Sequence, residues 1–473
     1  MSRAGLLASG RRIAPLAWPV FVGQIAVLAF GTVDTVLVAR ASALDLAALA
    51  IGAAAYISVF VGLMGVILAV GPIAGQFYGA GDLRGSGHVA RQAVWLALGL
   101  SVPGCALLVF PDPFLALAQA TPAVADKARG YLLALAFALP PALVFTAFRG
   151  FNVAVSRPKV VMALQLGGLA LKIPLSALLV YGVDIDGPLG GLRIPALGVT
   201  GCGIATAMVM TGQLLAALVL VRRSAFYARF GLDRGDLGRP DRASLGPLLR
   251  LGLPMGAAIM IEVTGFTFMA LFIARLGMTP VAGHQVAVNL VSMLFMMPLA
   301  IGHATSTLVA QRIGAGDPDD ARGLGWAGLE IGVVIAAVVG GAVYLLRGSI
   351  VSLYTDNPVI VAAVLPLLAW MVLFHVADAA QTIAAFVLRA YRIATVPLFV
   401  YVAAVWGVGL GGGYLVAFDT SGIAPTWLHG ARGFWAMATF GLTLAGLAMA
   451  LYLGRVLRRQ ARGTAPVTVV TSG

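Results

Sequence analysis

Long apolar segments separated by short polar ones run through the whole chain. Each apolar segment is long enough for a helix across a hydrocarbon core of about 30 Å, which takes roughly 20 residues. Lipid offers the backbone no hydrogen-bond partner, so we expect helices, and the short alternating segments of a membrane barrel do not fit the pattern. The pattern predicts twelve helices, near residues 14–38, 47–73, 92–110, 128–148, 159–182, 197–221, 247–274, 282–310, 324–346, 359–388, 396–418 and 432–454.

A polar heptapeptide occurs twice, as QFYGAGD at 76–82 and as QRIGAGD at 311–317, an offset of 235 residues. A second pair, FRGFNVA at 148–154 and LRAYRIA at 388–394, lies at an offset of 240. The chain therefore contains an internal repeat of two halves, and each half holds six predicted helices. Because six is an even number, the two halves enter the membrane in the same direction, which is a parallel repeat.

The repeated heptapeptide follows the second predicted helix of each half. Its glycines can end a helix and turn the chain, and Asp82 and Asp317 can then cap the next helix. We therefore predict a tight turn at both places, with no phosphate-binding role.

The repeat also predicts the organisation of the chain. An N-terminal six-helix lobe covers 1–221, a cytoplasmic linker rich in Arg, Asp and Gly covers 222–246, and a C-terminal six-helix lobe with a short basic tail covers 247–473. The fold class is an all-α integral membrane protein of twelve transmembrane helices in two six-helix bundles.

Composition agrees with a membrane protein, since 10% of the residues are charged against about 25% in soluble domains. The net charge of +13 could indicate nucleic-acid binding, but the positions of the charges argue against it. If the N-terminus is cytoplasmic, 23 of the 31 Lys and Arg residues fall on the inner side and seven on the outer. This bias predicts both termini in the cytoplasm. Cys105 and Cys202 lie in apolar segments, where a disulfide or metal site is not expected.

Several segments carry a family resemblance: VAGHQVAVNLVSMLFMMPLAIGHATSTLVAQRIGAGD (281–317), FGTVDTVLVAR (30–40), LGLPMGAAIMIEV (251–263) and the LRAYR run. They resemble the multidrug and toxic compound extrusion (MATE) family, in its NorM-like bacterial branch, over nearly the whole chain. The resemblance implies two lobes that alternate between inward-open and outward-open states and export cationic or amphipathic drugs in exchange for Na⁺ or H⁺. It also implies a monomer in the bacterial inner membrane, with small-molecule drugs and membrane lipids as partners and no cofactor besides the coupling ion.

Four ionisable residues lie well inside predicted helices: Asp34, Lys172, Glu262 and Asp378. Such residues cost several kcal/mol in a membrane and are functional candidates. Glu262 and Asp378 could face one cavity and bind a cation or share protons, or else make structural hydrogen bonds between helices. The resemblance matches Glu262 and Asp378 to the acids of the NorM-like cation site, and Asp34 to the acid of the first helix. All three acids are therefore candidate sites for the coupling ion or proton.

Two positions depart from the family pattern beside these acids. Many relatives have Tyr four residues before the acid of the tenth helix, where this chain has Phe374, which offers no oxygen. His375 lies one turn from Asp378 and can titrate near neutral pH. We therefore favour protons over sodium, while His375 could equally be a polar residue packed between helices.

Lys172 is the second departure, in LKIPLS (171–176), where relatives commonly have Asn at the positions of Lys172 and Ser176. We predict that Lys172 extends its side chain to pair with Asp34. Alternatively, it reaches water that lines the cavity and selects among substrates. Gln285 and Asn289 are further candidates for cavity contacts, and Asn289 resembles a position that lines the second lobe.

No catalytic motif is visible in the sequence, which lacks a Walker loop, H-E-x-x-H and G-x-S-x-G. We therefore predict a secondary antiporter and no enzyme. A lipid or oligosaccharide-lipid flippase of the same broader superfamily is the alternative, and only Lys172 indicates the cationic cavity it would need. A membrane-embedded prenyl transferase would need an acidic pair such as D-x-x-x-D, which we do not find.

Overall fold

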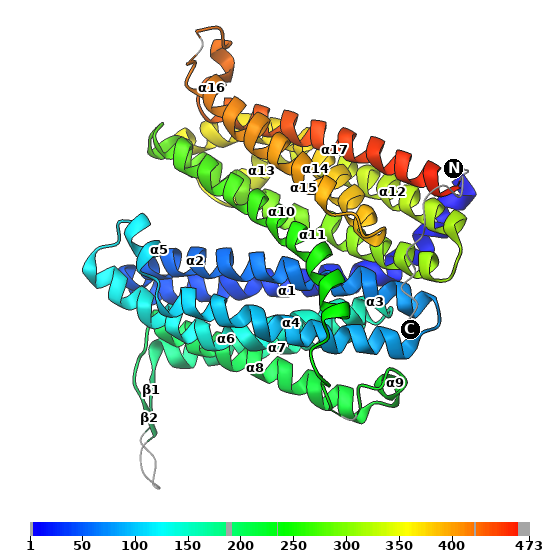
Figure 1. The fold of residues 1–473 in the computed structure, drawn as a ribbon. Coiled ribbons are helices and arrows are strands. Elements are labelled where there is room, and N and C mark those ends of the chain that lie inside the picture. Colours follow the sequence, from blue (N-terminus) through cyan, green and yellow to red (C-terminus); the bar gives the residue numbers. More distant parts are fainter. Residues whose placement is uncertain (1–2, 186–191, 234, 421, 462–473) are drawn as a thin grey trace. The chain divides into compact units, whose positions relative to one another are not determined.

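The computed structural model describes residues 3–185, 192–233, 235–420 and 422–461 (Figure 1). Within these ranges, twelve helical segments are long and apolar enough to cross a membrane, so the predicted all-α fold class is confirmed. The predicted basic tail, residues 462–473, lies outside the described residues. The elements are α1 (Arg3–Ala41), α2 (Ala43–Ile67), α3 (Val70–Gly79), α4 (Leu83–Val109), α5 (Asp112–Leu117), α6 (Pro122–Ala154), α7 (Pro158–Tyr181), β1 (Val183–Ile185), β2 (Leu192–Ile194), α8 (Val199–Arg223), α9 (Ala225–Ala228), α10 (Arg242–Ala274), α11 (Met278–Gly314), α12 (Pro318–Leu345), α13 (Arg347–Ser352), α14 (Pro358–Ala390), α15 (Thr395–Tyr401), η1 (Val402–Gly412), α16 (Gly413–Ala417), η2 (Thr426–Leu428) and α17 (Ala431–Ala461).

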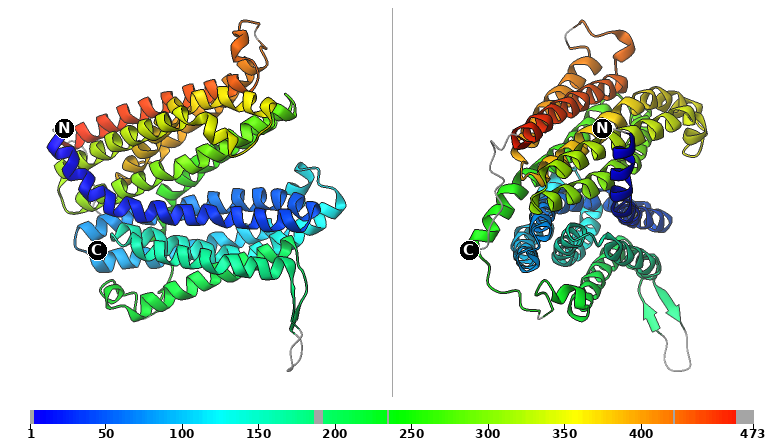
Figure 2. Two further views of the ribbon diagram at one scale, coloured as in Figure 1. Left: turned by 180° about the vertical axis from the view of Figure 1, so that it is seen from behind. Right: turned by 90° about the vertical axis from the view of Figure 1, so that its right-hand side faces the viewer.

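Two membrane spans are built from more than one element. The second span consists of α2 and α3, and the eleventh consists of α15, the π-helical segment η1 and α16. The β-structure among the described residues is a short antiparallel hairpin, in which Val183 of β1 pairs with Ile194 of β2. Figure 2 shows this hairpin extending from the ends of α7 and α8.

The repeated heptapeptide forms the predicted turn in both halves. Gly81 and Gly316 adopt positive φ angles of 79° and 74°, which favour glycine. Asp82 then accepts a hydrogen bond from the backbone N–H of Gly85 at 2.7 Å, and Asp317 accepts one from that of Asp320 at 3.1 Å. Each aspartate therefore caps the following helix, as the sequence predicts.

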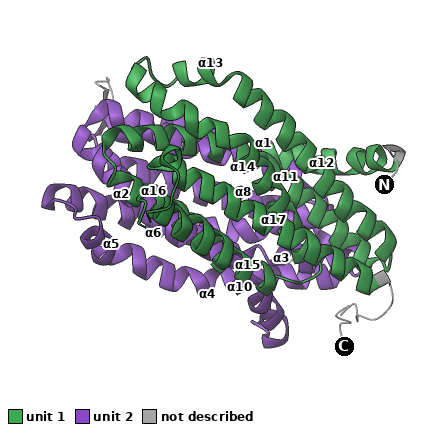
Figure 3. Ribbon diagram, turned by 90° about the horizontal axis from the view of Figure 1, so that it is seen from above, with its two compact units in different colours: residues 1–21, 257–473 green, residues 22–256 purple. Residues whose placement is uncertain are grey.

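The chain forms two compact units, residues 22–256 and residues 1–21 with 257–473 (Figure 3). Both changes of unit fall inside a helix, α1 or α10, shortly after Pro19 or Pro254. The units therefore differ from the lobes predicted from the sequence repeat. The segment 1–21 joins the unit formed by the second half, and the linker 222–246 joins the unit formed by the first half.

The exchanged segment of α1 is firmly attached within its unit. Arg12 donates two hydrogen bonds to the Asp320 carboxylate, at 2.8 and 2.9 Å, and Arg312 reaches the same carboxylate at 2.9 Å. Ile13 is 2% exposed and belongs to a core with residues of α11, α12, α14 and α17. Charge pairing and apolar burial together thus hold this segment in place.

One long helix lies at the centre of each unit. Helix α6 packs against α2, α4 and α8, and helix α14 packs against α11, α12 and α17. FRGFNVA forms the end of α6, and LRAYRIA begins in the last residues of α14 and continues past its end. The repeat therefore places the most buried helix of each unit at an equivalent position in the sequence.

Candidate ion-coupling sites

The unit of residues 22–256 contains a buried ion pair between Asp34 on α1 and Lys172 on α7. The Lys172 Nζ atom lies 2.9 Å from the Asp34 carboxylate. It also donates to the Thr206 hydroxyl at 2.6 Å and to the Cys202 carbonyl at 3.2 Å, both on α8. The Ser176 hydroxyl donates a hydrogen bond to the Oδ1 atom of Asp34 at 3.3 Å. We call these five residues the Asp34–Lys172 network.

The Asp34–Lys172 network satisfies its charges internally. An ammonium has three protons to donate, and the three partners of Lys172 match that number. The Lys172 side chain is 0% exposed, which does not fit the alternative in which it reaches water. The residues at 172 and 176, where the chain departs from the family pattern, both contact the acid of the first helix.

Glu262 and Asp378 form a second group, in the other unit. Asp378, on α14, is 3% exposed and accepts a hydrogen bond from the Gln381 amide at 3.0 Å. Glu262, on α10, is partly exposed and makes no hydrogen bond or ion pair with any described residue. Asp378 and Arg389 are close enough to Glu262 to act on it electrostatically. We call Glu262 and Asp378 the acid pair.

Arg389 and Tyr401 complete the surroundings of the acid pair. Neither is among the site residues predicted from the sequence. The hydropathy pattern places Arg389 just beyond the predicted helix 359–388, on the inner side, but it lies inside α14 with 6% of its surface exposed. Its guanidinium lies over the Phe386 ring, 4.5 Å from the centroid. Tyr401 is 3% exposed and lies within electrostatic range of both acids. One cation and one phenol therefore accompany two carboxylates.

A signal for Arg389 is present in the sequence repeat. FRGFNVA and LRAYRIA have Arg at the same place, as Arg149 and Arg389. In its own unit, Arg149 also points inward, and it donates to the Gln24 side chain and the Met64 sulfur, each at 3.2 Å. A basic residue repeated near the end of both central helices thus indicates an inward-facing role rather than a loop.

Phe374 and His375 lie in the core beside the acid pair. Phe374 is 2% exposed and packs against Trp435 and Phe266, with ring centroids 5.5 and 6.1 Å away. His375 is 2% exposed, and its Nε2 atom has no hydrogen-bond partner in the described part of the chain. His375 is therefore buried with one ring nitrogen unsatisfied, which does not fit the alternative of a fully paired structural histidine.

Gln285 and Asn289 lie one turn apart on an exposed face of α11. Asn289 accepts a hydrogen bond from the Tyr354 hydroxyl at 2.8 Å. Neither residue is hydrogen-bonded to the acid pair in the ranges that the structure covers. The same ranges contain no group of three or more His, Cys, Asp or Glu residues that could hold a metal ion.

Twelve membrane spans in two repeated units, with ionisable groups buried far from the helix ends, define a multi-pass membrane transporter. The MatE family model matches residues 19–178 and 254–415, once in each half of the chain. The chain belongs to this family of multidrug efflux transporters.

Relatives are similar over nearly their full lengths. The chain is 37% identical to a probable multidrug resistance protein NorM of Aromatoleum aromaticum, covering 94% of this chain and 93% of the relative. It is 35% identical to the multidrug resistance protein PmpM of Pseudomonas aeruginosa, covering 95% and 92%. The crystal structure of the eukaryotic MATE transporter AtDTX14 has the same fold, with a TM-score of 0.84, 21% identity and coverage of 98% and 100%. These relatives are named for multidrug resistance or transport, and none of the three is named as an enzyme.

Proposed function

We propose that the protein is a secondary antiporter that exports cationic or amphipathic compounds in exchange for H⁺ or Na⁺, by alternating access. Its location would be the bacterial inner membrane, with both termini cytoplasmic, and it would act as a monomer without a cofactor. The observation that carries this proposal is the acid pair: two carboxylates within a membrane-spanning unit, of which Glu262 has no ion-pair partner among the described residues. A carboxylate so placed can exchange a proton or a cation as the surroundings change.

The acid pair is a better candidate for coupling than Asp34. In the Asp34–Lys172 network the carboxylate already holds an ammonium and a hydroxyl, so a proton or Na⁺ would have to displace Lys172. At the acid pair, the formal charge of two carboxylates and Arg389 is −1, which an added cation or proton would neutralise. We therefore assign ion coupling to Glu262 and Asp378, and a structural or gating role to Asp34.

Protons are favoured over sodium as the coupling ion. Na⁺ is held by several oxygen ligands, and Phe374 contributes none where many relatives have Tyr. Toward Asp378, Gln381 presents its amide nitrogen and not its oxygen. A flippase function receives less support, because Lys172 is enclosed by its own network and adds no exposed cation.

The proposal predicts that Glu262→Gln and Asp378→Asn each reduce gradient-driven export at least tenfold while the protein stays folded. The amides keep the shape of the side chains but can neither titrate nor pair with a cation. Purified variants in liposomes should be energised by a pH gradient and, separately, by a sodium gradient. Asp126→Asn, which changes a side chain that is 80% exposed, is the matched control and should transport normally.

Two results decide the assignment. Full transport by either amide variant would remove that residue from coupling. Export that follows a sodium gradient but ignores a pH gradient would replace protons with sodium as the coupling ion.

A further inference from the structure

Glu330 is a carboxylate that the acid pair and the Asp34–Lys172 network leave unexplained. It lies 12 residues beyond Pro318 on α12, about 18 Å along the helix at 1.5 Å per residue. The side chain is exposed, and it makes no hydrogen bond or ion pair with any residue that the structure describes. An unpaired carboxylate on the exposed face of a membrane span is costly, which makes it a candidate for a ligand contact.

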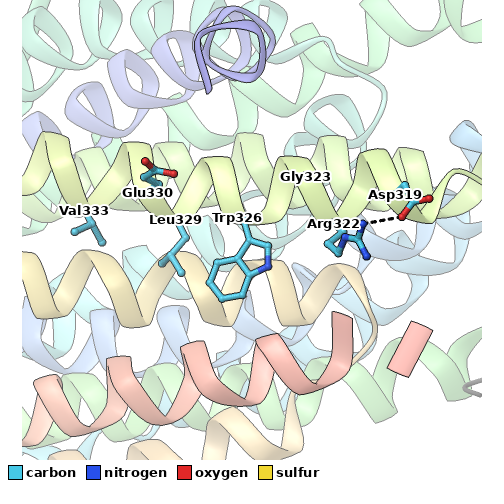
Figure 4. Close-up of a pocket in the computed structure, with 7 residues that line it drawn as sticks. All are labelled: Asp319, Arg322, Gly323, Trp326, Leu329, Glu330 and Val333. Atoms are coloured by element: carbon cyan, nitrogen blue, oxygen red, sulfur yellow. Dashed lines mark ion pairs between the residues drawn. The ribbon is translucent and has the colours of Figure 1, made fainter. Parts of the chain in front are cut away.

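Glu330 lines a groove of about 530 Å³ on α12 (Figure 4). That volume is within the range of roughly 300–1,000 Å³ for sites of drug-sized ligands. The other lining residues are Asp319, Arg322, Gly323, Trp326, Leu329 and Val333. Figure 4 shows Arg322, Trp326, Leu329 and Val333 following one another along the same helix.

Trp326 places an aromatic surface one turn from Glu330, on the same side of the helix. Its side chain is 37% exposed, and its ring lies against α17, where a β-carbon added to Gly454 would be 3.6 Å from the ring. Tryptophan is typical of the boundary between lipid and water. The groove therefore begins at the lipid boundary and extends one turn deeper, to the carboxylate.

The charges that line the groove select the sign of a ligand. Arg322 is the cation among the lining residues, and it pairs with Asp319 at 3.0 Å. Glu330 is left with an uncompensated negative charge, so an anionic headgroup is disfavoured. A carboxylate with an indole one turn away attracts organic ammonium groups through ionic and cation–π contacts, while the partly exposed Val333 offers apolar surface.

We propose that this groove binds amphipathic organic cations dissolved in the lipid, with the charged group at Glu330 and the apolar part on Trp326 and Val333. Its role as a capture site that supplies substrate for export rests on the proposed transport function, whereas the binding itself does not. The groove is separate from the acid pair, since the two share no residue.

Binding of rhodamine 6G, a fluorescent amphipathic cation, tests this proposal. Fluorescence anisotropy should be measured on the full chain in dodecyl maltoside, with Glu262→Gln and Asp378→Asn present so that the acid pair cannot contribute. In that background Glu330→Gln should weaken binding about tenfold, because the ionic contact is lost. Trp326→Leu should weaken it several-fold, and Trp326→Phe should retain most of it.

Val334→Gln is the matched control, since it places the same amide on a neighbouring side chain that is 54% exposed. It should leave the affinity unchanged, and all variants should keep the parental melting temperature. Unchanged binding in Glu330→Gln, or an equal loss in Val334→Gln, would overturn the proposal.

The source of the cation is tested by adding lipid. If phosphatidylethanolamine displaces rhodamine 6G at a lower mole fraction than phosphatidylglycerol does, the natural occupant is an amine-bearing lipid and a dissolved cation is rejected. The expected result is that phosphatidylethanolamine has no greater effect than phosphatidylglycerol. Because transport is not measured here, failure of the groove and failure of the acid pair remain distinguishable.

Discussion

Asp34 and Lys172 are both buried, so the charge of each is compensated by the other and by the two hydroxyls and the Cys202 carbonyl around them. Removing one partner of a buried ion pair typically costs about 3–5 kcal/mol, whereas replacing both can be nearly neutral. We therefore expect Asp34→Asn and Lys172→Met each to lower the thermal stability strongly and to impair export. The double variant should recover a large part of both losses.

A double-mutant cycle on thermal unfolding and on liposome transport measures this coupling. Strictly additive losses would show that the two side chains act independently despite their 2.9 Å contact. The buried Thr206→Val change is a useful third variant, because it removes one acceptor from Lys172 without altering a charge.

Residues whose type alone is costly in lipid could be predicted from the sequence. Asp34, Lys172, Glu262 and Asp378 stand out for this reason, and opposite charge was enough to pair the first two. Residues near the ends of the apolar segments could not be assigned, because hydropathy does not show whether a flanking charge faces water or the core. Arg389 lies just beyond the predicted helix 359–388, and Tyr401 resembles any other aromatic residue of a helix.

At the scale of the element, apolar segments predicted the number of helices but not their limits. The first was expected over 14–38, and α1 covers Arg3–Ala41. Hydropathy marks the part of a helix that suits lipid, whereas the helix itself continues until a cap or turn residue ends it. Nothing in the sequence indicated the turn that divides α2 from α3 or the π-helical geometry of η1. The repeated heptapeptide did indicate its turn, because its glycine and aspartate have defined roles in a turn.

The repeated turn gives a prediction about stability. Gly81→Ala and Gly316→Ala should each destabilise the protein by about 1–2 kcal/mol, because alanine is strained at positive φ. A β-carbon would meet no atom within 4 Å at either position, so the strain is in the backbone and not in packing. Thermal unfolding in detergent should show lower melting temperatures for both variants.

Helical glycines provide matched controls for these two changes. Gly212→Ala on α8 and Gly341→Ala on α12 also add a β-carbon into open space. Alanine is favoured by roughly 0.5–1 kcal/mol in a helix, so these variants should be neutral or more stable. If all four substitutions behaved alike, the turn geometry would not be responsible.

At the scale of the whole molecule, the even number of spans found among the described residues predicts that residues 3 and 461 lie on one side of the membrane. The excess of basic residues on the inner side predicts that this side is the cytoplasm. Reporter fusions after the last residue and within residues 225–245 should both give cytoplasmic signals, while a fusion in the hairpin between β1 and β2 should not. A periplasmic signal at residues 225–245 would contradict the parallel repeat.

Because each unit includes a segment from the other half of the sequence, the two halves of the chain cannot form whole units separately. A cut anywhere in the linker 222–246 would yield two polypeptides, and neither would contain a whole unit. The first would keep Arg12 and Ile13 but lack the helices on which they pack, and the second would lack residues 1–21. Each fragment would thus carry a piece that the other needs, so the two halves of this duplicated chain are expected to fold only together.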